Sequence, residues 1–155
     1  MVILIGAFIT LKSSIAGAGA SDGRFIAYDD GTVWDTQTDL LWAARDNGSN
    51  IKWEDAKFYC ENYRGGSYKD WRMPTLNELE GLYDESKSRP ATCYSGNNIH
   101  VATELIDITC FYSWASETST TTAEAAIFDF GPGIRSAFAS QLPRLSRVLP
   151  VRSGK

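Results

Sequence analysis

The sequence feature that most constrains the fold is a helix start at residues 74–78. Thr75 directly follows Pro74 and stands three residues before Glu78. This is the spacing of a capping box, in which the threonine hydroxyl and the glutamate carboxylate each accept a hydrogen bond from the other residue's backbone N–H. The apolar residues that follow at helical spacing are Leu76, Leu79, Leu82 and Tyr83. The pattern predicts a helix from Thr75 that buries one face in a core.

A second helix is expected upstream, beginning at Trp53. One face of this segment is apolar at helical spacing, and its members are Trp53, Ala56, Cys60 and Tyr63. Glu54 and Asp55 stand in its first turn, where their charge complements the helix dipole. Gly65 and Gly66 then end the helical pattern. Both apolar stripes are interpreted as core faces rather than as cofactor-binding motifs.

Short strands are expected on either side of the two helices. Before them, residues 24–28, 32–35 and 40–43 are suited to strands, and turn residues such as Asp29, Asp30 and Gly31 separate them. After them, the strand candidates are residues 111–115, 125–130, 134–138 and 146–151. Residues 117–122 form a low-complexity linker between two of these strands. The mature chain is therefore expected to open with a β-meander.

Residues 1–20 are interpreted as a truncated secretory signal or a retained hydrophobic leader, with a buried first strand or helix as the alternative. Residues 2–11 form an apolar run that is too short to span a bilayer, which needs about 20 residues. The small residues Ala18, Gly19 and Ala20 have the pattern of a signal cleavage site, although the basic segment that normally precedes the run is missing. We therefore expect one domain over residues 21–155, an extracellular, periplasmic or cell-surface location, and no transmembrane span.

Three cysteines fit an exported chain in which two of them pair. Cys93 and Cys110 enclose a loop of 16 residues, and closing a loop of that size stabilises a fold by about 3 kcal/mol in the chain-entropy model. Cys60 lies on the first helix face and is expected to pack as a small apolar side chain. The alternative is a metal site formed by Cys93, Cys110 and His100, but the spacing matches no tight metal-binding pattern. No metal and no cofactor are expected.

Charge is unevenly distributed along the chain. The net charge is -4, but residues 1–130 hold ten basic and nineteen acidic side chains, whereas residues 131–155 hold five basic side chains and no acidic one. The overall charge excludes nucleic acid as a partner. An anionic ligand should instead prefer the last 25 residues. The single histidine, His100, leaves one candidate base for a Ser-His or Cys-His mechanism.

Five motifs follow one another along the chain. They are Gly31-Thr32-Val33 with Asp35, Thr38, Leu40 and Trp42; Trp53 with Asp55-Ala56 and Tyr59-Cys60; Asp70-Trp71-Arg72-Met73-Pro74-Thr75 with Glu78-Leu79; Trp114-Ala115-Ser116-Glu117; and Leu149-Pro150-Val151-Arg152. In this order and spacing they resemble the C-terminal domain of the Legionella collagen-like adhesin, a family often described only as a domain of unknown function. The resemblance covers residues 24–155, and the motif around Trp71 is its most specific part.

The middle motifs are also similar to those of formylglycine-generating enzymes and their relatives. This similarity implies an α+β fold, namely a C-type-lectin-like domain in which two helices pack on a small twisted antiparallel sheet, with long loops and with the chain ends close together. The oxidase activity is not implied, because those enzymes rely on a C-terminal cysteine pair and no cysteine follows Cys110 here.

Most residues inside the motifs are interpreted as structural. Thr75 and Glu78 cap a helix, and Arg72 just before them is expected to pair with a carboxylate. The candidate partners of Arg72 are Asp70, Glu54 and Glu78. Aromatic side chains dominate small cores, so the tryptophans of the motifs are expected to be buried. These are Trp42, Trp53, Trp71 and Trp114.

Ligand binding is expected on loops instead, because a rigid framework usually carries variable binding segments. The first loop region offers polar and aromatic side chains suited to sugar hydroxyls, which are Tyr94, Asn97, Asn98 and His100. The second, residues 131–147, combines guanidinium groups with a ring and an amide, in Arg135, Phe138, Gln141, Arg144 and Arg147. Arginine clusters bind sulfate and carboxylate groups, and the adhesin that the chain resembles binds sulfated glycosaminoglycans. The alternative is that these arginines only balance the acidic remainder of the chain.

The sequence thus predicts a secreted or envelope-associated, non-catalytic adhesion module that recognises a glycan or a surface protein through its C-terminal loops. Three alternatives come from other classes. One is a structural subunit of an extracellular assembly, which would associate with itself. Another is a lectin-like oxidase that uses Cys60 or Cys93 with His100, which requires a reactive thiol of low pKa. The third is a sensory module of a larger protein.

Overall fold

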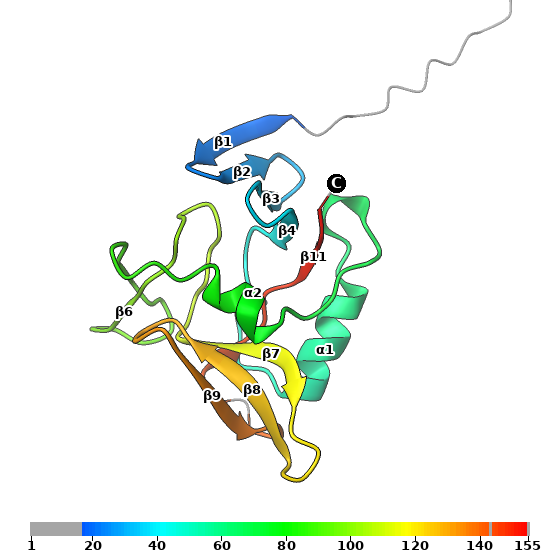
Figure 1. The fold of residues 1–155 in the computed structure, drawn as a ribbon, viewed down its shortest axis with the longest axis vertical. Helices are drawn as coiled ribbons and strands as arrows, with labels where there is room; N and C mark the ends of the chain where they lie inside the picture. Colours follow the sequence, from blue (N-terminus) through cyan, green and yellow to red (C-terminus); the bar gives the residue numbers. More distant parts are fainter. Residues whose placement is uncertain (1–16, 143, 155) are drawn as a thin grey trace, which may run out of the picture.

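Strands make up most of the regular structure in the computed structural model, which describes residues 17–142 and 144–154. Five of them form an antiparallel sheet in the order β1–β2–β3–β4–β11. Their bounds are β1 Ala18–Asp22, β2 Phe25–Tyr28, β3 Thr32–Asp35, β4 Leu40–Ala43 and β11 Val151–Ser153. The expected β-meander is therefore confirmed, and β1 and β11 extend it on opposite edges (Figure 1).

A second sheet has the order β10–β7–β8–β9, in which β10 runs parallel to β7 and the other pairs are antiparallel. Its strands are β7 Tyr112–Thr118, β8 Glu124–Asp129, β9 Ile134–Ala139 and β10 Ser146–Arg147. A small third sheet pairs β5 (Arg89–Pro90) with β6 (Asn98–Ile99). Figure 1 shows the five-stranded sheet at one end of the molecule and β7, β8 and β9 at the other.

Two α-helices in the described part of the chain accompany these sheets. α1 spans Trp53–Asn62 and α2 spans Leu76–Glu80, with a short 3-10 turn, η1, at Gly65–Ser67. The capping box is confirmed, because the Glu78 N–H donates to the Thr75 hydroxyl over 3.2 Å and the Thr75 N–H donates to the Glu78 carboxylate over 2.8 Å. α2 packs on β7 and β8, and α1 packs on β7.

The expected C-type-lectin-like α+β fold is wrong. The described chain is mainly β, with three sheets, and its α-helices have ten and five residues. α2 is short because the chain turns away after Glu80. The N–H groups of Leu82 and Tyr83 bond to carbonyls only three residues back, and Tyr83 pairs with Val101 in a β-bridge. Apolar spacing over two turns does not reveal where a helix ends.

Other expectations about segments also need correction. Glu117 and Thr118, expected in a linker, belong to β7. The strand expected at 146–151 is divided between β10 and β11, which lie in different sheets. The described chain ends belong to β1 and β11, the two edge strands of the five-stranded sheet. Residues 1–16 of the expected leader lie outside the described residues. The expected cleavage point after Ala20 falls within β1.

Apolar side chains gather in two clusters. The larger one joins the five-stranded sheet to α2 and β8, and includes Trp42, Trp71, Leu79 and Phe128. The smaller one joins α1 to β7 and β8, and includes Trp53, Cys60, Trp114 and Ile127. The four tryptophans expected in the core are thus all buried. The indole N–H groups of Trp53 and Trp114 each donate to a backbone carbonyl over 2.8 Å, so these polar atoms are satisfied inside the core.

Cys93 and Cys110 form the expected disulfide. It joins the segment between β5 and β6 to the residues just before β7. Beside it, the N–H groups of Thr92 and Cys93 both donate to the carbonyl of Thr109 over 3.1 Å. Cys60 is a free thiol and fully buried in the smaller cluster, as expected for a packed apolar side chain. The loop that carries Asn97 and Asn98 is therefore tied to the second sheet.

Arg72 pairs with Glu78 and not with its other candidate partners. Its terminal nitrogens donate to the two carboxylate oxygens over 2.8 and 2.6 Å. Asp70 bonds to Arg152 instead. Burial raises the pKa of Glu78, but hydrogen bonds from Arg72 and Thr75 outweigh this effect, so the pKa lies below its ordinary value. One carboxylate thus caps α2 and fixes the segment before it.

We expect Glu78→Gln to lower the free energy of unfolding by about 1 kcal/mol at neutral pH, because glutamine can keep the capping bond but loses the ion pair with the partly exposed Arg72. Since the folded-state pKa of Glu78 is lowered, its contribution is complete above the ordinary pKa of glutamate and disappears as the pH falls through the folded-state pKa. Urea unfolding of both proteins from neutral to acidic pH tests this. The stability difference should shrink on acidification, and a constant difference would contradict the assignment.

Candidate ligand-binding surface

Two loops that are far apart in the sequence meet at one small pocket of about 290 Å³. Its lining residues are Asn97, Asn98, Phe111, Tyr112, Asp129, Gly131 and Pro132. Asn97 and Asn98 belong to the first loop region expected from the sequence, whereas Gly131 and Pro132 belong to the second. The structure therefore joins regions that the sequence left separate. We call this recess the loop pocket.

Backbone hydrogen bonds hold the first wall of the loop pocket in place. The carbonyl of Asn97 accepts a bond from the Ala91 N–H over 3.0 Å. The His100 N–H donates to the carbonyl of Phe130 over 2.8 Å, which ties the end of β6 to the end of β8. The side chains of Asn97 and Asn98 are exposed on this anchored backbone. Their amide groups are therefore presented to solvent from a fixed position.

The second wall is the turn between β8 and β9. The carboxylate of Asp129 accepts a hydrogen bond from the Gly131 N–H over 2.9 Å. Gly133 has a φ of +72°, and a Cβ atom there would lie 2.4 Å from the ring of Tyr83. A glycine is required at this position, because the turn adopts a left-handed conformation and packs directly against an aromatic ring. Tyr83 thus sets the position of the turn.

Asp129 is the one acidic residue in the lining of the loop pocket. Burial raises its pKa, and the hydrogen bond from Gly131 opposes this effect only in part. Within the described residues no lysine or arginine forms an ion pair with Asp129, and the second carboxylate oxygen accepts no hydrogen bond. The carboxylate is therefore a partly desolvated acceptor that faces the pocket without a cation.

An aromatic strip extends the loop pocket across the second sheet. Tyr112, which lines the pocket, packs edge-to-face on Phe138 of β9 with ring centroids 4.9 Å apart. The guanidinium carbon of Arg144 lies 5.9 Å from the centroid of Phe138. We use the term aromatic strip for Tyr112, Phe138 and Arg144. The sequence did not identify Tyr112 as a site residue, because the alternation of polar and apolar residues in a strand does not show whether its first side chain is covered by other parts of the chain.

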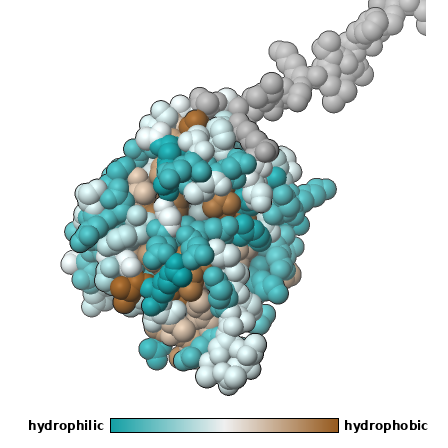
Figure 2. Space-filling view, viewed as in Figure 1, coloured by the Kyte–Doolittle hydropathy of each residue, from teal (hydrophilic) through white to brown (hydrophobic). Residues whose placement is uncertain are grey.

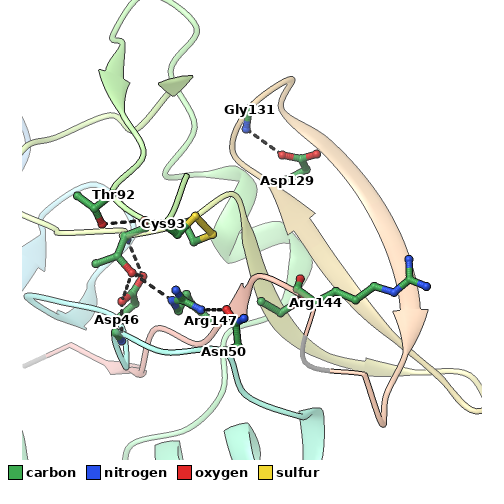
Figure 3. Close-up of a disulfide and its surroundings, with 12 residues drawn as sticks. Asp46, Asn50, Thr92, Cys93, Asp129, Gly131, Arg144 and Arg147 are labelled. Atoms are coloured by element: carbon green, nitrogen blue, oxygen red, sulfur yellow. Dashed lines mark hydrogen bonds between the residues drawn. A yellow bond between two sulfur atoms is a disulfide. The ribbon is translucent and has the colours of Figure 1, made fainter. Parts of the chain in front are cut away.

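The three arginines expected to form one anion-binding cluster are separated. Arg135 donates to Asn77 over 2.6 Å and forms an ion pair with Glu80, both on α2. Arg147 is buried, with 7% of its surface exposed. Figure 3 shows Arg147 turned toward Asp46 and Asn50, and Arg144 extended away from them. Of the three, Arg144 alone belongs to the aromatic strip.

Arg147 belongs to a buried hydrogen-bond network. The Thr109 hydroxyl donates to the carboxylate of Asp46 over 2.9 Å and accepts a bond from Arg147 Nε over 3.3 Å. Arg147 also donates to the side chain of Asn50. Burial raises the pKa of Asp46, while hydrogen bonds from Thr109 and Gly48 and the charge of Arg147 oppose the change. The role of Arg147 in the described structure is to compensate a buried carboxylate.

The remaining expected ligand residues lie around these features. Gln141 is exposed shortly after β9, and Tyr94 is 58% exposed in the loop beside the disulfide. His100 is half-buried, its Nδ1 lies 3.0 Å from the Lys87 carbonyl, and its ring packs beside Tyr83. His100 therefore faces the Lys87 segment and is not among the residues that line the loop pocket.

The groups at this surface are suited to hydrogen bonding and ring contact. Among the described residues no group of three His, Cys, Asp or Glu side chains is placed to hold a metal ion. Burial raises the pKa of the free Cys60 thiol, and Cys93 is in the disulfide. The loop pocket and the aromatic strip instead offer side-chain amides, a carboxylate, a phenol, a phenyl ring and a guanidinium group.

The fold and this surface define a small β-rich domain with a disulfide-anchored loop region. A comparison with protein families identifies it further, because the model of the Lcl C-terminal domain matches residues 31–152. The chain belongs to the Lcl C-terminal domain family, as its motifs indicated. Membership of this family is consistent with an adhesion-type module. A search of curated proteins gives no match to the chain.

The described residues contain no helix with the length and apolar character needed to cross a membrane. The Cys93–Cys110 disulfide fits an oxidising environment, since disulfides persist mainly outside the cytosol. Together with the family, this fits an extracellular or surface location.

Arg147 and Arg144 provide a direct test of these assignments. We expect Arg147→Ala to lower the free energy of unfolding by about 2–3 kcal/mol, because Asp46 would then be buried without a nearby positive charge and Thr109 and Asn50 would lose a hydrogen-bond donor. We expect Arg144→Ala to change it by less than about 0.5 kcal/mol, because Arg144 is exposed and forms no ion pair among the described residues. Chemical denaturation at neutral pH measures both values. Equal, small losses would mean that Arg147 has no structural role.

Proposed function

We propose that this chain is a non-catalytic adhesion module that binds a surface glycan at the loop pocket and the aromatic strip. The observation that carries the proposal is the convergence of two loops, from residues 97–98 and 131–132, on one recess with polar groups and an aromatic wall. Small-molecule sites generally have this form, a concave surface with a few fixed polar groups. The disulfide and the backbone bonds near it favour a site that is already formed before the ligand binds.

The side chains of this surface suit a sugar. A carboxylate accepts hydrogen bonds from hydroxyls, and a side-chain amide both donates and accepts, so Asp129 and Asn98 match the two roles that sugar hydroxyls play. Ring faces such as that of Tyr112 offer apolar contact for the C–H face of a sugar ring. On the face of the molecule in Figure 2, hydrophobic residues form separate small spots on a mainly hydrophilic surface. On this face, a polar ligand is therefore favoured over a broad apolar protein interface.

The thiols support a non-catalytic role. An oxidase would need an accessible thiolate near His100. Cys93 and Cys110 are bonded to each other, and Cys60 is fully buried with a raised pKa. An apolar environment of this kind keeps a thiol protonated and unreactive.

A secreted or envelope-associated location agrees with the disulfide and with the interpretation of residues 1–20 as a leader. We propose one binding domain over residues 21–155.

We expect the purified protein to bind a subset of an immobilised glycan array, and we expect Asn98→Ala to reduce that binding about tenfold, which corresponds to the loss of one or two hydrogen bonds. The matched control is Asn62→Ala, because Asn62 is also exposed but lies at the end of α1, outside the lining of the loop pocket. An absence of glycan hits, or equal effects of the two substitutions, would contradict the proposal.

A second candidate function is self-association as a structural subunit, and β9 is the feature that favours it. In the described structure β9 forms the free edge of its sheet, and five of its six residues are exposed, including Ile134 at 53%. A long exposed edge strand offers unpaired backbone groups to another chain.

If β9 mediates self-association, light scattering at micromolar concentration should detect dimers or larger species. Ala137→Lys should reduce them, because a charge on an edge strand opposes pairing. Thr121→Lys is the control, since Thr121 is exposed in the turn between β7 and β8. A monomer at all concentrations would exclude the structural-subunit candidate while leaving glycan binding untouched.

A further inference from the structure

The charges around the loop pocket restrict the class of glycan that it accepts. The basic C-terminal residues suggest an anionic ligand as long as only the sequence is considered. In the structure, Arg135 is already paired with Glu80, and Arg147 is buried with Asn50 and Thr109. A guanidinium group that already forms an ion pair has fewer N–H donors and less uncompensated charge with which to bind a sulfate. The surface is therefore left with Arg144 as the described guanidinium group of the aromatic strip.

The loop pocket itself carries a negative charge. Asp129 lines it, and no described lysine or arginine forms an ion pair with that carboxylate. The other polar side chains of the lining are two neutral amides and a phenol, from Asn97, Asn98 and Tyr112. A sulfate or carboxylate group placed in this recess would meet a like charge in a partly desolvated site, which is unfavourable.

The same groups are well matched to neighbouring hydroxyls. One oxygen of Asp129 is held by the Gly131 N–H, so the carboxylate has a fixed orientation and its other oxygen is available as an acceptor. The exposed amide of Asn98 lies across the same recess and both donates and accepts. A volume of about 290 Å³ lies at the small end of the range for ligand pockets. One sugar ring, and not a long segment of an oligosaccharide, is the unit that such a recess holds.

We infer that the loop pocket binds a single uncharged sugar ring through adjacent hydroxyls, with Asp129 and Asn98 as the specificity-determining residues. This inference rests on the proposed function and names its ligand class. Asp129 accepts a hydrogen bond from one hydroxyl, and Asn98 serves the next hydroxyl. Tyr112 contacts the C–H face of the ring. Arg144 lies outside the recess and contacts the part of the glycan that is attached to the bound ring.

The test uses an array that presents each galactose-, glucose- and mannose-terminated oligosaccharide in unmodified, sulfated and carboxylated forms. The wild-type protein should bind unmodified terminal sugars at least about tenfold more strongly than their sulfated counterparts. Asp129→Asn should reduce binding of the unmodified sugars about tenfold, because a charged acceptor is replaced by a neutral one of the same shape. Asp129→Asn should also reduce the ratio of binding to unmodified sugars over binding to sulfated sugars, because the repulsion between the Asp129 carboxylate and a sulfate group is removed.

Two controls separate binding from folding and from nonspecific charge effects. Asp129→Asn should unfold at the same temperature as the wild type or higher, since burial raises the pKa of Asp129 and the folded state therefore disfavours the ionised form above its ordinary pKa. Arg135→Ala should leave binding unchanged, because that guanidinium group is bonded to Glu80 and Asn77. Binding of unmodified sugars should also be nearly independent of salt concentration.

The outcomes distinguish this inference from the proposed function. Hits confined to sulfated or carboxylated glycans would overturn the inference and leave glycan binding intact. Hits on unmodified sugars that are insensitive to Asp129→Asn would overturn the assignment of the ring to the loop pocket. An array without any hits would overturn the proposed function itself.

Discussion

The buried network of Asp46, Thr109 and Arg147 is the constraint on which the arrangement of the loops depends. Asp46 follows β4, Thr109 precedes the disulfide, and Arg147 ends β10, so one set of hydrogen bonds joins three distant parts of the chain. The carbonyl of Thr109 also receives the N–H groups of Thr92 and Cys93. Burying Asp46 costs free energy unless its hydrogen bonds form together. The position of the first loop is therefore coupled to the packing of β10 against β7.

This network also explains why a basic C-terminal segment does not create a basic surface. The segment 144–147 must supply one guanidinium group to the interior. The parallel pairing of β10 with β7 accompanies Arg147 turned toward Asp46, while Arg144 extends away toward Phe138 (Figure 3). Acidic side chains elsewhere in the chain form ion pairs with other arginines. Glu80 takes Arg135, and Asp70 takes Arg152. The local excess of positive charge in the sequence is therefore neutralised by ion pairs with distant residues, which only the tertiary structure reveals.

Sequence reasoning succeeded where a signal is local and failed where it depends on distant partners. The capping box at Thr75, the start of α1 at Trp53 and the first three strands of the meander each follow from a few neighbouring residues. The disulfide was found because an exported chain with three cysteines leaves few pairings. The end of α2, the division of residues 146–151 between two sheets and the pairing of the arginines all depend on contacts across the fold. The fold class was wrong for the same reason, since similar motifs around two helices do not specify the sheets that surround them.

The balance of charge around Asp129 bears on the role that we propose for the loop pocket. Half-buried Glu78 has a cation as its partner in Arg72, and the buried Asp46 accepts hydrogen bonds from Thr109. Asp129 has one backbone N–H and a raised pKa. Keeping such a group ionised reduces the stability of the fold, and the Gly131 bond compensates only part of that reduction. A ligand that supplies further hydrogen-bond donors would offset the remainder, and a sugar bound at the proposed site supplies such donors to Asp129.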